Sequence, residues 1–175
     1  MRFRWPVYVF IGAILLVLLF YIGLATGALA PYLGGYDPGS DDSGYEHTTV
    51  VVVDGETGEE LGRVDAAVAD TFSKRYVGLS ETDSLPDDRG MLFVHGDVDE
   101  RTYVMRNMSF GIDIVFVDAD GTITEIHEAP EPGPGEDGNQ QRYTGTGRYV
   151  LEVNKGWMAD RGVEAGDRIE SDRVG

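Results

Sequence analysis

The sequence contains no cysteine and almost no lysine. Without cysteine, the chain has no disulfides, no thiol catalysis and no cysteine-ligated zinc or iron–sulfur site. Lysine occurs only at Lys74 and Lys155. The three histidines, His47, His95 and His127, are far apart and lack the paired spacings of zinc enzymes. The sequence therefore predicts no metal site.

Positive charge is scarce throughout the chain. Lys and Arg number 14 against 31 Asp and Glu, which gives a formal net charge of −17. Nucleic acids are bound by clustered basic side chains, so this composition argues against nucleic acid as a partner. The shortage of lysine and the excess of acid together favour a protein of very high salt, where self-repulsion is screened. We therefore expect a halophilic, archaeal source. An ordinary acidic protein is the alternative, but it does not explain the missing lysine.

Fingerprints of the common enzyme classes are also missing. The chain has no Gly-x-Ser-x-Gly elbow, no phosphate-binding loop and no dinucleotide-binding motif, so the sequence predicts no cofactor. Asp118 to Gly121 lacks the further acidic ligands of a calcium loop and is better interpreted as a hairpin turn. Carboxylate pairs have no diagnostic value here because acidic residues are everywhere. Nothing in the sequence names a reaction.

One long hydrophobic run is present near the N-terminus. Val7 to Ala30 covers 24 positions without a charged side chain, and a helix needs only about 20 apolar residues to cross a bilayer. Arg2 and Arg4 precede the run, and Asp37 is the first charge after it. By the positive-inside rule, residues 1–6 stay in the cytoplasm and the rest of the chain lies outside. The sequence predicts a single-pass membrane protein that contacts the lipid bilayer through residues 7–30.

A cleaved signal peptide is the alternative interpretation of the same run. Ala28-Leu29-Ala30 has the small-x-small pattern of a cleavage site. However, the run is longer than the roughly 7–15 apolar residues of a signal peptide. Pro31 would directly follow the cut, where its fixed φ angle hinders binding in an extended protease site. These points favour a retained anchor, while secretion after cleavage stays open.

The remaining chain divides into a tether and one domain. Residues 31–47 are mostly Gly, Pro, Ser, Asp and Tyr without apolar periodicity, which is typical of a flexible tether. Residues 48–175 form an extracytoplasmic domain that is large enough to bury a core. Its expected strands are 48–53, 61–68, 91–94, 102–105, 112–118, 122–127, 148–153 and 168–170, its expected helices 71–79 and 155–161, and its long loop 129–147.

These elements predict the fold class. Asp70 is positioned to cap the first helix, and Asp120-Gly121 to turn a hairpin. Many short strands with two short helices indicate a mostly β fold with a minor α+β character. We expect a small single-domain β-barrel or sandwich behind one transmembrane helix.

The densest group of unusual residues lies between Arg89 and Asp118, and it forms part of a longer pattern. The chain resembles the uncharacterised family catalogued as "domain of unknown function 192" over about residues 64–170. The matching residues are, in chain order, Ala69-Asp70-Thr71, Arg75, Gly78-Leu79, Gly90-Met91-Leu92-Phe93, Tyr103 to Asn107, Asp113 to Asp118, Tyr149-Val150-Leu151-Glu152, Gly162-Val163 and Gly166 to Ile169. The resemblance implies a compact β-rich domain, often exported behind a signal or anchor, with no established activity.

The chain departs from the family pattern at one place. Many members carry Ala-Pro-Pro-Cys after the hairpin strand, whereas Ala129-Pro130 is followed here by Glu131-Pro132. Any role of the family that depends on that thiol therefore cannot apply to this chain.

Five residues of this block are candidates for a ligand-binding site. Three arginines, Arg89, Arg101 and Arg106, lie within eighteen positions of a chain that has nearly eliminated lysine. A guanidinium suits a carboxylate or a phosphate. The residues that we expect to form a shallow site for an anion or polar ligand are Arg89, Tyr103, Arg106, Asn107 and Asp113.

A structural role is the alternative for the same residues. Arg106 and Asn107 are expected to occupy adjacent strand positions and to point to opposite faces. Arg106 would then pair with Asp113, and Asn107 would satisfy a buried turn. Both interpretations stay open at the level of sequence.

The function that fits these observations best is binding. We expect a non-catalytic, membrane-anchored extracytoplasmic module that binds a polar ligand, an envelope component or an envelope protein. One alternative is an envelope-acting enzyme, favoured if Arg106, Asn107 and Asp113 converge in a cleft with a carboxylate of raised pKa. The other is a structural accessory to a membrane complex, favoured by a flat apolar patch without a cleft.

The absence of cysteine allows a direct test of the predicted topology. In intact expressing cells, we expect a membrane-impermeant maleimide to label a Ser43→Cys variant but not a Phe3→Cys variant, because only the former thiol lies outside. The Phe3→Cys variant should become labelled after permeabilisation. Mass spectrometry of the purified chain should show residues 1–30 retained, and a mature chain starting at Pro31 would establish cleavage instead.

Overall fold

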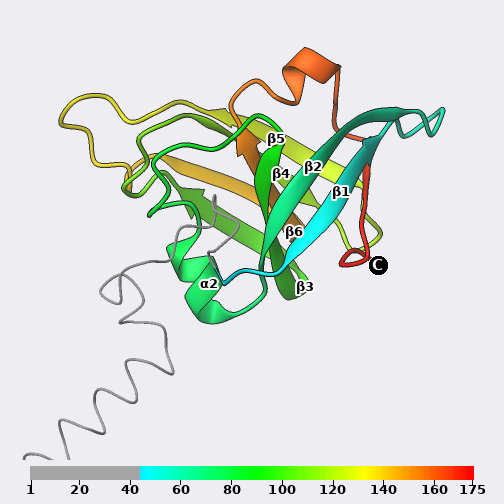
Figure 1. The fold of residues 1–175 in the computed structure, drawn as a ribbon, viewed down its shortest axis with the longest axis horizontal. Helices are drawn as coiled ribbons and strands as arrows, with labels where there is room; N and C mark the ends of the chain where they lie inside the picture. The colour runs from blue at the N-terminus through cyan, green and yellow to red at the C-terminus, as the bar shows by residue number, and fades with distance from the viewer. Residues whose placement is uncertain (1–43) are drawn as a thin grey trace, which may run out of the picture.

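A curled, seven-stranded sheet dominates the structure (Figure 1). The structure is a computed structural model and describes residues 44–175. The strands are β1 (His47–Val53), β2 (Glu60–Ala69), β3 (Arg89–Val104), β4 (Ile112–Val117), β5 (Ile123–Ala129), β6 (Arg142–Asn154) and β7 (Arg168–Glu170), in the spatial order β5-β4-β6-β3-β2-β1-β7. Besides the sheet, the described residues contain the short helix α2 (Phe72–Val77) and the 3-10 turn η2 (Ala159–Arg161). The prediction of a mostly β domain is confirmed, in the form of a half-barrel.

The position of α2 follows from the only parallel strand pair among the described residues. β2 and β3 run parallel, in register from Asp65 opposite Arg89 to Ala69 opposite Phe93, whereas the other neighbours are antiparallel. A parallel connection must cross from the end of one strand back to the start of the next. Here residues 70–88 make that crossing and contain α2. The helix therefore lies against the sheet beside β3.

The two edge strands of the sheet meet at one corner. The backbone N–H of Ile123 donates to Asp167 O at 2.8 Å, and that of Ile169 donates to Gly121 O at 2.8 Å. Gly121 has a φ of 90°, and a Cβ at this position would lie 2.6 Å from Ile169 O. A side chain would therefore separate the edges, which explains why the hairpin turn needs glycine here.

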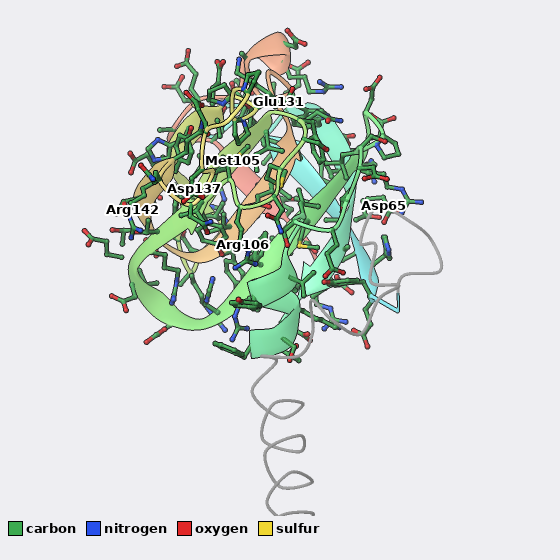
Figure 2. All side chains as sticks on the ribbon, turned by 90° about the vertical axis from the view of Figure 1, so that its left-hand side faces the viewer. Asp65, Met105, Arg106, Glu131, Asp137 and Arg142 are labelled. Carbon is green, nitrogen blue, oxygen red and sulfur yellow. The ribbon has the colours of Figure 1, made fainter. Side chains whose placement is uncertain are left out.

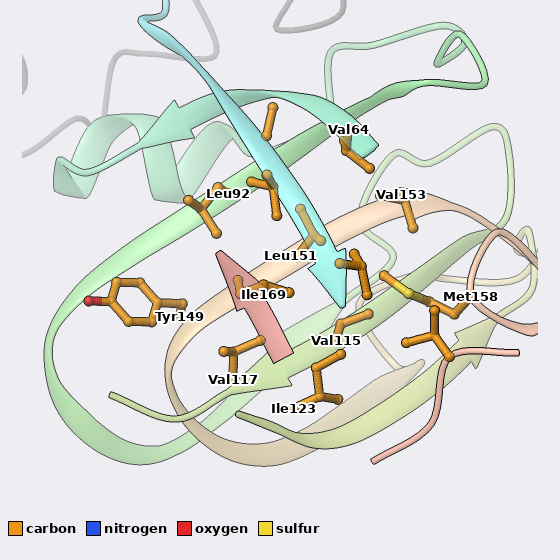
Figure 3. Packing of buried hydrophobic residues seen from close by; sticks show 14 of the residues in the cluster. Val64, Leu92, Val115, Val117, Ile123, Tyr149, Leu151, Val153, Met158 and Ile169 are labelled. Carbon is orange, nitrogen blue, oxygen red and sulfur yellow. The ribbon is translucent and has the colours of Figure 1, made fainter. Parts of the chain in front are cut away.

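Side chains of β3, β4 and β6 are buried on both faces of the sheet. Successive residues of a strand point to opposite sides. Accordingly, Leu92, Val115 and Leu151 belong to a first core cluster (Figure 3), whereas Met91 and Ile114 belong to a second. The same alternation has consequences for polar residues on these strands. It places Glu152 on the face of the second cluster and Asp113 on the face of the first.

Some expected elements have different bounds in the structure. β3 is one strand of 16 residues, with a register shift against β6 between Val94 and Asp99, where two strands were expected. β6 begins at Arg142, within the expected loop 129–147. Pairing between β3 and β6 stabilises both segments as strands, although each contains residues of weak β propensity, Asp and Glu in β3 and Gly in β6.

The two expected helices are shorter than predicted. α2 is capped by Thr71, whose Oγ1 accepts from the N–H of Lys74 at 3.3 Å, and the expected capping by Asp70 is wrong. The second helix is reduced to η2, which ends at Gly162 with a φ of 68°.

The predicted membrane anchor cannot be compared with the fold. Residues 7–30, and the predicted tether up to residue 43, lie outside the described residues. Within residues 44–175, no helix combines the length and the apolar character needed to span a bilayer. Anchorage stays a prediction from sequence.

The first core cluster predicts the cost of removing one of its central side chains. Leu151 is fully buried and lies opposite Leu92 and Val115, so Leu151→Ala should leave a cavity between three strands. We expect the free energy of unfolding to fall by about 2–5 kcal/mol, as measured by urea denaturation of the full-length chain. Val98→Ala, at a side chain that is 43% exposed, is the matched control and should change little. Equal losses in both variants would contradict the assigned core.

Candidate functional site

A pocket of about 410 Å³ lies between α2 and β3. Residues 75–80, from α2 and the turn after it, line one side, and β3 lines the other between Phe93 and Val104. Ile112 of β4 and Glu152 of β6 also line the pocket, on the face of the second core cluster. The pocket therefore contains side chains from several segments that are far apart in the sequence.

Glu152 is the least expected residue in this pocket. Its side chain is only 5% exposed and lies on β6 between Met91 of β3 and Ile114 of β4. The carboxyl group has no hydrogen bond or ion pair with any of the residues that the structure describes. Burial raises the pKa of Glu152 from 4.5 to about 8, because a charged carboxylate is poorly solvated there. At neutral pH the pocket wall therefore includes an uncharged carboxylic acid.

Beside Glu152, a histidine and a tyrosine form a hydrogen-bonded pair. His95 Nε2 lies 2.9 Å from the hydroxyl of Tyr103. Burial lowers the pKa of His95 to about 4, with further contributions from Arg101 and Arg75. Burial raises the pKa of Tyr103 well above its ordinary value, and nearby Glu152 raises it further. Both members of the pair are therefore uncharged at neutral pH.

The ring of Tyr103 is held in place by aromatic contacts. It packs edge to face against Phe93, with ring centres 5.0 Å apart, and against Phe116, with ring centres 5.9 Å apart. These contacts fix the direction in which the hydroxyl points. The pair with His95 is thus part of a rigid wall.

Three arginines surround the pocket, and they differ in their partners. Arg101 is paired with Asp97 at 2.9 Å. Arg75 donates from one nitrogen to two backbone carbonyls, at 2.7 and 2.9 Å. Arg106 donates to the backbone oxygen of Tyr76, and its guanidinium lies 4.3 Å from the centre of the Tyr76 ring. Within residues 44–175, neither Arg75 nor Arg106 has a carboxylate partner.

The pocket brings together two of the five residues predicted from the sequence. Tyr103 and Arg106 both line it. Arg89 lies elsewhere and forms an ion pair with Asp65 at 2.8 Å; Figure 2 shows Asp65 well separated from Arg106. Asn107 is not in a strand, because β3 ends at Val104, and its φ of 55° places it in a turn. The expectation that Arg106 and Asn107 occupy opposite faces of one strand is therefore wrong.

Asp113 lies on the other face of the sheet. Its two carboxylate oxygens accept hydrogen bonds from the backbone N–H groups of Gly156 and Met158, each at 2.9 Å. Burial raises the pKa of Asp113, and these two hydrogen bonds partly oppose the shift. The carboxylate holds the turn before η2 in place. The expected Arg106–Asp113 pair does not form, because alternation directs Asp113 away from the pocket.

Sequence reasoning did not single out Glu152, His95 or Arg75 as site residues. A signal for Glu152 was present, because it interrupts a run of buried apolar residues in β6. In a chain with 31 acidic residues that signal is hard to recognise. His95 and Arg75 come near each other only through the crossover between β2 and β3.

The pocket falls within a region that is shared with other proteins. The family described as "DUF192: Uncharacterized ACR" matches residues 53–171. No curated protein matches the chain.

Two solved structures share the fold. A protein from Sinorhizobium meliloti 1021, described as a candidate transcription regulator, is similar with a TM-score of 0.66 and 29% identity, over 74% of this chain and 97% of that one. A protein of unknown function from Novosphingobium aromaticivorans DSM 12444 is similar with a TM-score of 0.61 and 28% identity, over 75% of this chain and 89% of that one.

The raised pKa of Glu152 predicts how stability depends on pH. Between pH 4.5 and 8 the folded state keeps a proton on Glu152 that the unfolded state has released, so this group destabilises the fold as pH rises. His95 opposes this trend up to pH 6.5, because its pKa is lowered on folding. From about pH 6.5 to 8 the effect of Glu152 is unopposed by His95 and reaches up to about 1.4 kcal/mol per pH unit.

Urea denaturation of the wild type and of Glu152→Gln over pH 5.5–8.5 measures this effect. The difference in the free energy of unfolding should shift in favour of Glu152→Gln as pH rises and level off above pH 8. Glu60→Gln, at a surface position, is the matched control and should follow the wild type. Parallel curves for the wild type and Glu152→Gln would show that Glu152 titrates normally.

Proposed function

This chain belongs to the uncharacterised DUF192 family, as its motifs predicted, and we propose from its pocket that the domain binds a small polar ligand without converting it. The observation that carries this proposal is Glu152, a buried carboxyl group without a partner among the described residues, facing a pocket beside two arginines that also lack a carboxylate. Polar groups in the interior of folded proteins nearly always have a hydrogen-bond partner in the protein or in ordered water. A bound ligand would supply the missing partners.

The size and lining of the pocket support a small ligand. Small-molecule pockets range from about 300 to 1,000 Å³ and combine apolar walls with a few polar groups. The volume of about 410 Å³ lies in that range. Phe93, Leu79 and Ile112 provide apolar walls, while His95 and Tyr103 provide uncharged polar atoms.

Binding is better supported than catalysis. The enzyme hypothesis requires Arg106, Asn107 and Asp113 to converge in one cleft, and Asp113 lies on the opposite face of the sheet. His95, with a pKa of about 4, is a weak base at neutral pH. Glu152 has a pKa of about 8, and acid–base catalysis also needs a nucleophile or a second proton carrier with a suitable pKa.

A structural accessory role is less well supported by the exposed surface. Such a role needs a contiguous apolar patch. Among the described residues, the exposed large apolar side chains are Phe72, Tyr76 and Val98. Phe72 and Tyr76 both belong to α2, and their rings stack on each other. Two neighbouring rings make a small patch beside a pocket that is already formed.

The proposed setting is the outer side of a cell membrane at high salt. The uncharged run 7–30 would hold the domain at the bilayer, and the ligand would be a soluble polar molecule or a part of the envelope. The description of the S. meliloti protein as a candidate transcription regulator does not transfer readily. A chain with a net charge of −17 is repelled by nucleic acid.

A ligand-dependent thermal shift screen tests the proposed function. We expect at least one compound from a panel of small polar molecules to raise the Tm of the full-length chain in mild detergent, at a fixed molar salt concentration. A ligand at 100 times its Kd stabilises the folded state by about 2.7 kcal/mol. Arg106→Ala should reduce the shift, because it removes one of the pocket's cations.

Arg63→Ala is the matched control for this screen. Arg63 is exposed and paired with Glu60, away from the pocket lining, so its loss should leave the ligand-induced shift unchanged. The proposal fails if no compound raises the Tm, or if Arg106→Ala and Arg63→Ala respond to every compound like the wild type.

A further inference from the structure

We infer that the occupant of this pocket is a small zwitterion with an apolar body, of the kind represented by a free apolar amino acid or a short peptide with both ends free. Its ammonium group would lie at Glu152 and its carboxylate at Arg75 and Arg106. This inference rests on the proposed function, because it assigns a chemical class to the ligand of the same pocket.

The assignment of the ammonium group rests on the surroundings of Glu152. The strands on either side present Met91 and Ile114, and no described residue donates a hydrogen bond to the carboxyl group. A ligand anion would face an acid of like charge once Glu152 ionises. A ligand ammonium would instead provide several N–H donors and a compensating charge, so that the ionised carboxylate becomes stable inside the fold.

The assignment of the carboxylate rests on the two arginines without a carboxylate partner. Arg75 and Arg106 bind backbone carbonyls and an aromatic ring, all of which are neutral. A guanidinium has five N–H donors, and the hydrogen bonds to these carbonyls use only one nitrogen of each side chain. Further N–H groups of both residues are therefore available to a ligand carboxylate.

Uncharged side chains line the same pocket as Glu152 and the two arginines. Neither arginine forms an ion pair with Glu152. Burial is the cause of the raised pKa of Glu152. Phe93, Ile112 and the uncharged pair of His95 and Tyr103 line the same pocket. A ligand that contacts both Glu152 and the arginines would therefore place an apolar body beside its two charges, against these side chains.

Calorimetry with three related probes tests the inference on the wild-type chain. L-leucine carries both charges, N-acetyl-L-leucine lacks the ammonium, and L-leucinamide lacks the carboxylate. We expect L-leucine to bind at least about tenfold more tightly than either blocked probe, since each lost ion pair in a desolvated site costs at least that much affinity.

Variants identify which residue each end of the probe contacts. Glu152→Gln keeps the size of the side chain, and it should weaken L-leucine while leaving N-acetyl-L-leucine nearly unchanged. Arg106→Gln should weaken L-leucine while leaving L-leucinamide nearly unchanged. Glu60→Gln and Arg63→Gln, at exposed positions away from the pocket, are the matched controls and should bind every probe like the wild type.

Proton release provides a readout that a purely structural role of Glu152 would not produce. At pH 7 Glu152 is mostly protonated in the empty pocket, because its pKa is about 8. An ammonium that binds there should expel that proton, so L-leucine should release close to one proton per binding event. Titration in buffers of different ionisation enthalpy measures this number. N-acetyl-L-leucine should release none, and Glu152→Gln should release none with any probe.

The outcomes separate the two proposals. If the blocked probes bind as tightly as L-leucine, or if L-leucine binds without proton release, the zwitterion assignment is wrong while the pocket is still a binding site. If none of the three probes binds but the thermal shift screen finds another ligand, the assignment is again wrong and the proposed function stands. If the probes and the screen both fail, both proposals are overturned. The comparison of probes uses the wild type, so it decides the matter even if Glu152→Gln does not fold.

Discussion

The parallel pairing of β2 with β3 is the constraint on which the pocket depends. Parallel neighbours cannot be joined by a tight turn. Residues 70–88 must therefore run from the end of β2 back to the start of β3, and this connection contains α2. α2 and the residues after it form one wall of the pocket, and β3 forms the other. Arg75 spans the two, because it donates to the carbonyl of Asp70, before the helix, and to that of Val94 in β3. One topological choice thus creates the cavity and places a cation beside it.

The alternation of side chains along β4 and β6 then distributes the buried acids. Asp113 and Glu152 are both buried carboxyl groups, and they belong to opposite faces of the sheet. Asp113 meets two backbone N–H donors and serves the fold. Glu152 lies between Met91 and Ile114, and its carboxyl group forms no hydrogen bond within the described chain. The difference in their roles comes from what each face contains, since the two groups are chemically the same.

Strand bounds were predicted well from sequence where turn residues mark the ends of a strand. β7 has the bounds expected from its turn signals, and β4 and the hairpin after it are nearly as expected. The start of β6 was missed because it contains glycines, yet a Cβ on Gly145 would lie 2.5 Å from the Phe116 ring. That glycine is required by packing, which periodicity does not reveal. Tyr103 and Arg106, which both line the pocket, could be picked out as candidates because they stand out locally in the sequence. Glu152 and Arg75 acquire their meaning only from the crossover and the alternation.

The pairing of β1 with β7 has a consequence for the order in which the chain folds. Val51 lies opposite Glu170, so β1 obtains its second neighbour only after the chain has been synthesised as far as β7. Pairings between residues so distant in sequence form slowly, because a long loop must close first. A chain whose sheet cannot be completed early stays unfolded for longer. Such delayed folding would suit the export that we propose for this chain, because an exported polypeptide passes through a narrow translocation channel before it becomes compact.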